Sequence, residues 1–224
     1  MIIAIDGPAG AGKSTVCKIL ANRLGFVYLD TGAMYRAVAW AVETGPMGCG
    51  KNGAPADLRL REVLLARELR FCVENDRLGI FWGEKRLTEE LRTPEATEAA
   101  SRISRLPEVR QFLVEWQRRL AREASGIVAE GRDTATVVFP DAELKVFLTA
   151  DLKTRAKRRF DQYFEKGEKL CLEEIEALIL ARDAADSKRA HSPMRMAEDA
   201  VFLDTSGLSV QEVVDRLSQM AKRF

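Results

Sequence analysis

The sequence is poor in the residues that most often carry acid–base and metal chemistry. It has a single histidine, His191, and its four cysteines are scattered without a CxxC pair. Neither a Ser-His-Asp nor a Cys-His arrangement is therefore indicated. A zinc site or a disulfide framework is not expected either.

Long apolar runs and an excess of one charge are also missing. No stretch of about 18 uncharged apolar residues occurs, and Asp6 interrupts the N-terminal apolar run too early for a secretory signal. Lys and Arg total 35 against 34 acidic residues, so no global field favours nucleic acid or an anionic membrane. We expect a reduced, cytoplasmic protein that binds neither, and we expect a monomer.

What is present is an alternation of short apolar runs with longer amphipathic segments. It predicts an α/β fold with a parallel five-stranded sheet and helices on both faces. The expected strands are Ile2 to Ile5, Phe26 to Leu29, Ile127 to Ala129, Leu144 to Leu148 and Val201 to Leu203. The expected helices include Lys13 to Leu24, Val109 to Glu123, Thr154 to Glu165 and Val210 to Met220.

The pattern changes between the second strand and residue 91. Gly45 to Pro55 is rich in Gly and Pro and indicates a loop. Three short runs follow, separated by turn residues, and they predict a small antiparallel meander inserted into the core. These runs are Glu68 to Val73, Leu78 to Trp82 and Lys85 to Leu87.

A phosphate-binding motif connects the first expected strand to the first expected helix. Residues 7–15 read GPAGAGKST and match G-x-x-x-x-G-K-[ST] in the context that this motif requires. The glycines let backbone N–H groups approach phosphates, Lys13 adds charge, and Ser14 is the candidate Mg²⁺ ligand, with Thr15 next. The predicted ATP-binding residues are Gly7, Pro8, Ala9, Gly10, Ala11, Gly12, Lys13, Ser14 and Thr15.

The motif alone does not choose among kinases, GTPases and motor ATPases. A GTPase needs an NKxD segment to read guanine, and the sequence has none. The DxxG match Asp204 to Gly207 lies at the last expected strand and not after the second or third. The GTPase reading is therefore disfavoured.

Charged and polar residues follow the other strands, whose carboxyl ends should meet at one edge of the sheet. Asp30, Thr31, Tyr35 and Arg36 suit a phosphorylated ring-bearing ligand, although a capped helix start explains them equally well. Arg132 and Asp133 follow Gly131, which permits close backbone approach. Pairing with other loop charges is the alternative for these two.

Two helical segments carry further arginines. Arg155, Arg158 and Arg159 share a helix face and could clamp a phosphoryl group, or could simply be solvated. Arg182, Asp186 and Arg189 recur at i, i+4 and i+7, where ion pairing within the helix is the alternative. Asp183 and Lys188 lie off that stripe, so we assign both to solvent.

The absence of a candidate base bears on the acceptor. Transfer to a hydroxyl usually needs a group that takes its proton, whereas a phosphate monoester has a second pKa near 6 and is already ionised at neutral pH. Alignment and charge neutralisation then suffice for catalysis. An arginine-rich, histidine-poor site therefore favours a phosphate as acceptor.

Several longer motifs extend this picture over nearly the whole chain. With IDGPAGAGKST, LDTGAMYRAVA, LRTPEATEAASRIS, EGRDTATVVFPDAELKVFL and ARDAADSKRA, the sequence resembles the bacterial cytidylate kinase family. The resemblance implies one domain, 1–224, with a core (1–35, 111–150 and 191–224), a monophosphate-binding insert at about 36–110 and a lid at about 151–190. It implies transfer of the γ-phosphoryl group of ATP to CMP or dCMP with Mg²⁺, in pyrimidine nucleotide metabolism.

The resemblance also implies roles for single residues. Arg36 and Arg132 would hold the monophosphate, Arg182 and Asp186 the ribose, and Ser101, Arg110, Asp133 and Arg189 would surround the base. The residues expected to act in catalysis are Lys13, Arg132, Arg155, Arg158 and Arg159. Thr134-Ala135-Thr136 departs from the family's more common apolar residue and glycine.

Two alternatives stay open. Another P-loop monophosphate kinase, acting on UMP or AMP, would share most of these features. A regulatory module that binds nucleotide without turnover would need fewer of the charges that neutralise a transition state.

Overall fold

The computed structural model describes residues 1–43, 56–165, 167 and 170–224. The predicted loop Gly45 to Pro55 lies outside them. The chain divides into two compact units, the first comprising Met1–Tyr28 and Ser125–Phe224 and the second Leu29–Ala124. Strands and helices alternate as the sequence predicted, so the α/β class is confirmed.

A parallel sheet forms the centre of the first unit. Its strands are β1 (Ile2–Asp6), β6 (Ile127–Gly131), β7 (Leu144–Thr149) and β8 (Val201–Asp204), in the order β6-β1-β7-β8. Ile5 lies opposite Glu130, and Asp6 lies opposite both Gly131 and Phe147. The register therefore aligns the carboxyl ends of three strands at one edge. The fifth expected strand, β2 (Val27–Asp30), crosses the boundary between the units.

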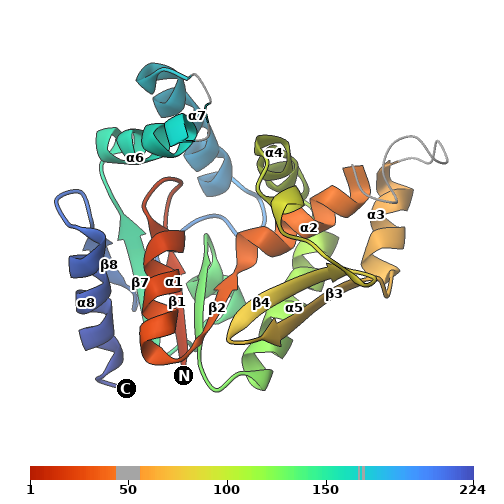
Figure 1. Ribbon diagram of the computed structural model, residues 1–224, viewed down its shortest axis with the longest axis horizontal. Coiled ribbons are helices and arrows are strands. Elements are labelled where there is room, and N and C mark those ends of the chain that lie inside the picture. The colour runs from red at the N-terminus through yellow and green to blue at the C-terminus, as the bar shows by residue number, and fades with distance from the viewer. Residues whose placement is uncertain (44–55, 166, 168–169) are drawn as a thin grey trace. The chain divides into compact units, whose positions relative to one another are not determined.

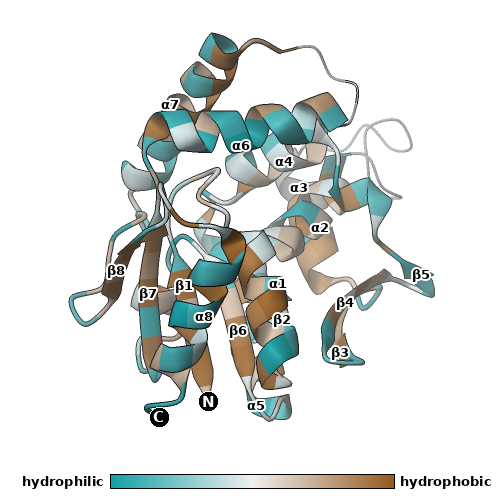
Figure 2. Ribbon diagram, turned by 60° about the vertical axis from the view of Figure 1, so that its left-hand side comes forward, coloured by the Kyte–Doolittle hydropathy of each residue, from teal (hydrophilic) through white to brown (hydrophobic). Residues whose placement is uncertain are grey.

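Helices α1 (Lys13–Leu24) and α8 (Val210–Ala221) pack together against this sheet, with Leu20 and Leu217 among the side chains fully removed from solvent. The sequence sets the start of α8 because Ser209 and Glu212 form a capping box. Strand β8 is largely hydrophobic in Figure 2.

Two further helices, α6 (Leu152–Glu165) and α7 (Leu172–Ser187), lie beyond the carboxyl ends of β1 and β7 (Figure 1). They pack on each other through a small apolar cluster that includes Ala156, Ile175 and Ile179. Both belong to the same compact unit as the phosphate loop, which we define as Gly7 to Gly12. The predicted division into core, insert and lid stays a prediction.

The second unit begins at Leu29, its first helix is α2 (Thr31–Glu43), and it contains the predicted meander. Strands β3 (Leu69–Glu74), β4 (Arg77–Trp82) and β5 (Lys85–Arg86) pair antiparallel, which confirms it. Asn75 and Asp76 make the tight turn between the first two strands with positive φ angles, a conformation that Asn and Asp tolerate. The remaining elements are α3 (Ala56–Leu65), the 3₁₀ turn Glu89–Leu91, α4 (Pro94–Ile103) and α5 (Pro107–Glu123).

Candidate active site

The phosphate loop follows β1 and opens α1, and its glycines are required by the backbone. Gly12 precedes the helix in the left-handed region, at φ 91°. Gly7 has φ +149°, and a Cβ placed there would lie 1.9 Å from the carbonyl oxygen of Leu148. Only glycine fits both the angle and the space, so the loop can present its N–H groups at the N-terminus of α1.

Lys13 is folded back onto the loop. Its Nζ donates hydrogen bonds to the carbonyl oxygens of Gly7 and Pro8, each at 2.8 Å. Burial lowers the pKa of Lys13 to about 7, and the positive charge of Arg132 is the second cause. Lys13 is therefore partly deprotonated near neutral pH. An anion bound to the loop would raise its pKa again and restore the positive charge.

Ser14 is linked to the end of β6. Its hydroxyl donates to Glu130 Oε2 at 2.9 Å, and the Tyr28 hydroxyl donates to Glu130 Oε1. Glu130 is 5% exposed, whereas Ser14 is exposed. An accessible hydroxyl beside a carboxylate supplies the hard oxygen ligands that Mg²⁺ prefers.

Asp6, the last residue of β1, organises the segment after Arg132 and Asp133. Its carboxylate accepts three hydrogen bonds, from the Thr134 N–H at 2.9 Å, the Thr134 hydroxyl at 2.6 Å and the Ala135 N–H at 2.8 Å. Burial raises the pKa of Asp6, and these hydrogen bonds oppose the rise. Residues Thr134–Val138 then form a turn of π-helix.

Asp186 of α7 and Arg189, which lies just beyond the end of that helix, form an ion network with Arg132. Arg132 Nε donates to Asp186 Oδ2 at 2.7 Å, and Arg189 donates to Asp186 Oδ1. The Asp186 side chain is 2% exposed, so two guanidinium groups compensate one buried carboxylate. Arg182 and Asp133 lie in the same unit, with Asp133 buried and Arg182 partly buried.

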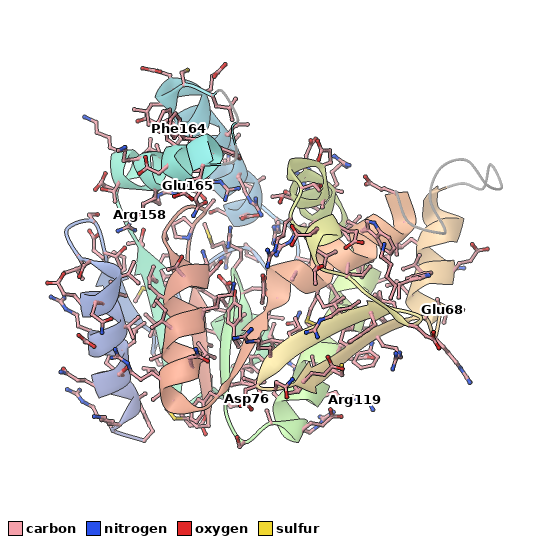
Figure 3. The ribbon with its side chains drawn as sticks, in the orientation of Figure 1. Glu68, Asp76, Arg119, Arg158, Phe164 and Glu165 are labelled. Carbon is pink, nitrogen blue, oxygen red and sulfur yellow. The ribbon has the colours of Figure 1, made fainter. Side chains whose placement is uncertain are left out.

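The three arginines of α6 make different contacts: two of them reach the phosphate loop and the third does not. Arg155 Nη1 donates to Ala9 O at 2.9 Å, and Arg158 Nη1 donates to Ala11 O at 3.2 Å. Figure 3 labels Arg158 on the side of α6 nearest to the phosphate loop. Arg159 instead contacts Gln162 and lies over the Tyr163 ring, 5.2 Å from its centroid.

The assignment of Asp183 to solvent was wrong. Its side chain is 17% exposed, and it forms an ion pair with Arg155 at 2.5 Å. Asp183 Oδ1 also accepts the N–H of Ala9, a residue of the phosphate loop, at 3.0 Å. Asp183 is therefore bound to the loop and is not solvated.

In the second unit, Asp30 caps the start of α2 and forms an ion pair with Arg36. Its Oδ1 accepts the Ala33 N–H at 2.8 Å at the start of α2, and its Oδ2 accepts Arg36 Nη2 at 2.9 Å. A Cβ on Gly32 would lie 3.1 Å from Arg36 Nη1, so the glycine gives the guanidinium room. Thr31 is buried at the first position of the helix.

The other predicted base-contacting residues of this unit lie on α4 and α5. Arg110 is buried, donates to Ser104 O at 3.2 Å, and stands 5.6 Å from the centroid of the Tyr35 ring. Ser101 lies on α4, and its carbonyl accepts the Ser104 hydroxyl. The structure thus brings Tyr35 and Arg110 together, while their roles toward a ligand stay predictions.

No binding or catalytic role was predicted for Glu130, Tyr28 or Asp6, although they contact Ser14 or the segment that follows Arg132. Glu130 carried a signal, since it is the last charged residue of a strand that ends beside the motif. Tyr28 carried none, because a tyrosine in a strand is typical of any buried sheet.

A phosphate loop after the first strand of a parallel sheet, followed by arginines on helices beyond the strand ends, defines a P-loop phosphotransferase. The sequence model of the family described as cytidylate kinase matches residues 3–223. This chain belongs to the cytidylate kinase family.

Curated relatives match this chain over nearly its whole length. The cytidylate kinase of Carboxydothermus hydrogenoformans is 43% identical over 224 residues, which cover 100% of this chain and 98% of the relative. That of Streptococcus pneumoniae (strain 70585) is 44% identical, covering 99% and 97%. A bifunctional pantoate ligase/cytidylate kinase of Synechococcus elongatus is 48% identical, covering 98% of this chain and 41% of that protein.

Among solved structures, the shikimate kinase of Bacteroides thetaiotaomicron is 14% identical, with a TM-score of 0.51 and coverage of 99% of this chain and 98% of that one. At this identity the likeness shows a shared kinase fold and nothing about the substrate.

Proposed function

We propose that this protein transfers the γ-phosphoryl group of ATP to CMP and dCMP, giving ADP and the corresponding diphosphate. Membership of the cytidylate kinase family, shared by relatives 43–44% identical over 97–98% of their own length, carries the proposal. The site supplies what such a reaction needs, namely a triphosphate-binding loop and several guanidinium groups.

The donor binds at the phosphate loop. Its phosphates take the loop N–H groups and the N-terminus of α1, and Lys13 leaves the carbonyl oxygens of Gly7 and Pro8 for the β- and γ-phosphate oxygens. Arg158 adds positive charge from α6 beside Ala11. These groups oppose the charge that develops on the transferred phosphoryl group.

Mg²⁺ fits the Ser14 and Glu130 pair. Among the residues that the structure describes, no cluster of three or more His, Cys, Asp or Glu could bind a metal by itself. Mg²⁺ typically takes one or two protein oxygens plus substrate phosphates and water, which Ser14 and Glu130 can complement. When bound, the ion neutralises phosphate charge; Glu130 orients the Ser14 hydroxyl, and Tyr28 orients Glu130.

For the acceptor we propose the residues named by the family resemblance. Arg36 and Arg132 bind the monophosphate, Arg182 and Asp186 the ribose, and Ser101, Arg110, Asp133 and Arg189 the base. Cytosine presents an amino donor beside two acceptors, which carboxylate and arginine groups complement. Uracil reverses the pattern at two positions and would leave buried polar groups unpaired.

A substrate panel tests the base assignment. We expect kcat/KM for CMP to exceed that for UMP and AMP by about a hundredfold or more, as expected when a hydrogen-bonding site rejects a mismatched analogue. Equal values for UMP or AMP would contradict it. Formation of ADP only when CMP is present would in turn exclude a regulatory module that binds ATP without turnover.

Asp133→Ala tests the assignment at the residue level. The KM for CMP should rise far more than the KM for ATP, because the proposed contact is to the cytosine base. A parallel rise in both would indicate a structural role for this buried carboxylate.

No helix in the described part of the chain is long and apolar enough to cross a membrane. We propose a cytoplasmic monomer. Sedimentation at micromolar concentration, with and without ATP, would test the oligomeric state.

A further inference from the structure

Ala9 lies in the middle of the phosphate loop, and side chains from two distant helices hold both of its peptide groups. Its N–H donates to Asp183 Oδ1 of α7 at 3.0 Å, and its carbonyl oxygen accepts Nη1 of Arg155 of α6 at 2.9 Å. The same Nη1 donates to Asp183 Oδ2 at 2.5 Å. One ion pair thus fixes the orientation of both peptides that flank Ala9.

The ion pair of Arg155 and Asp183 is largely buried, which strengthens it. The side chains of Arg155 and Asp183 are 10% and 17% exposed, and Arg155 Nε also donates to Ala150 O at 3.0 Å. Gly10, the next residue of the loop, packs closely against Arg155, because a Cβ on Gly10 would lie 3.1 Å from Arg155 Cβ. Charge-assisted hydrogen bonds in such surroundings constrain geometry more than surface pairs do.

We infer that Asp183 is a positioning residue for ATP binding, which acts by holding Ala9 and, with it, the phosphate loop in one conformation. A loop that binds phosphates with backbone N–H groups depends on the direction of every peptide. Prior fixing of those directions lowers the entropy lost when the triphosphate binds. The inference rests on the proposed use of ATP as donor.

Asp183→Asn removes the charge but keeps the size of the side chain. Its amide group must turn an N–H donor toward either Arg155 or the Ala9 N–H, so one of the two contacts is lost. We expect the KM for ATP to rise about tenfold, as for the loss of one charge-assisted bond, with the KM for CMP within about twofold of wild type.

The matched control is Asp161→Asn on α6, which breaks the exposed Lys157–Asp161 pair. It should leave both KM values unchanged. Activity of the wild-type protein with ATP and CMP tests the proposed function separately, so a silent Asp183→Asn would overturn only the present inference.

Three results would overturn it in a variant that keeps its fold by circular dichroism. These are a KM for ATP within twofold of wild type, a lower KM for ATP, and a parallel rise in both KM values. The last result would give Asp183 a general role in placing α7. If Asp183→Asn does not fold, Asp183→Glu keeps the charge and should raise the KM for ATP by a smaller factor; an unchanged KM for ATP there would equally contradict the inference.

Discussion

Protonation of Lys13 should control how ATP affinity depends on pH. The pKa of Lys13 is about 7 in the free protein, because the ammonium group is buried and lies near Arg132. Bound phosphates would replace the carbonyl partners with negative charge and return the pKa to at least its ordinary value of 10.5. ATP binding is therefore coupled to the uptake of a proton at every pH at which Lys13 of the free protein is neutral.

The size of the effect follows from the two pKa values. With a pKa of about 7, the protonated fraction falls from roughly a quarter at pH 7.5 to roughly 0.3% at pH 9.5. The affinity for ATP should weaken roughly 70-fold over this range, or about 2.5 kcal/mol. The phosphates of the nucleotide are already ionised above pH 7.5 and add little.

Calorimetric titration with a non-hydrolysable ATP analogue, in two buffers of different ionisation enthalpy, measures both the affinity and the number of protons taken up on binding. We expect close to one proton taken up per site at pH 8.5. Lys13→Arg is the matched control: the guanidinium stays protonated, so its affinity, although weaker, should not change across the same range. A wild-type affinity that is flat from pH 7.5 to 9.5, with no proton uptake, would refute the reasoning.

Three more substitutions test the structure directly. Thr134→Val removes the hydroxyl that donates to buried Asp6, so the free energy of unfolding in urea should fall by about 1–3 kcal/mol, and Thr134→Ser should restore most of it. Among the described residues neither Nε2 nor Oε1 of buried Gln117 has a hydrogen-bond partner, so Gln117→Leu should raise the melting temperature, and a lower one would reveal a partner. Gly7→Ala places a Cβ against Leu148 O and should abolish binding of the ATP analogue in calorimetry. Alanine at Gly207, where a Cβ has no atom within 4 Å, should not affect binding.

The sequence allowed the phosphate loop to be predicted because every part of that motif is local. The strand, the glycines at positive φ and the start of α1 at Lys13 all lie within a few residues of one another. The parallel strands were predictable for a similar reason, since each is a short apolar run with a helix beside it in the sequence.

Several contacts that complete the site join residues more than a hundred positions apart. Ser14 meets Glu130 and Asp6 meets Thr134 only because β1 and β6 are neighbours in register, with Ile5 opposite Glu130. Strand order cannot be read from composition or spacing. Sequence reasoning could therefore place Glu130 at the right edge of the sheet without identifying its partner.

The error at Asp183 has a specific physical cause. Asp183 lies off the stripe of Arg182, Asp186 and Arg189, which is why the sequence pattern places it in solvent. Yet Ile175, Ile179 and Asp183 recur at intervals of four, and both isoleucines are buried against α6. Asp183 thus continues the packed face of α7 one turn beyond its apolar part, where a carboxylate must find a partner or remain uncompensated. Arg155, on the facing helix, is that partner, and Ala9 of the phosphate loop is the second.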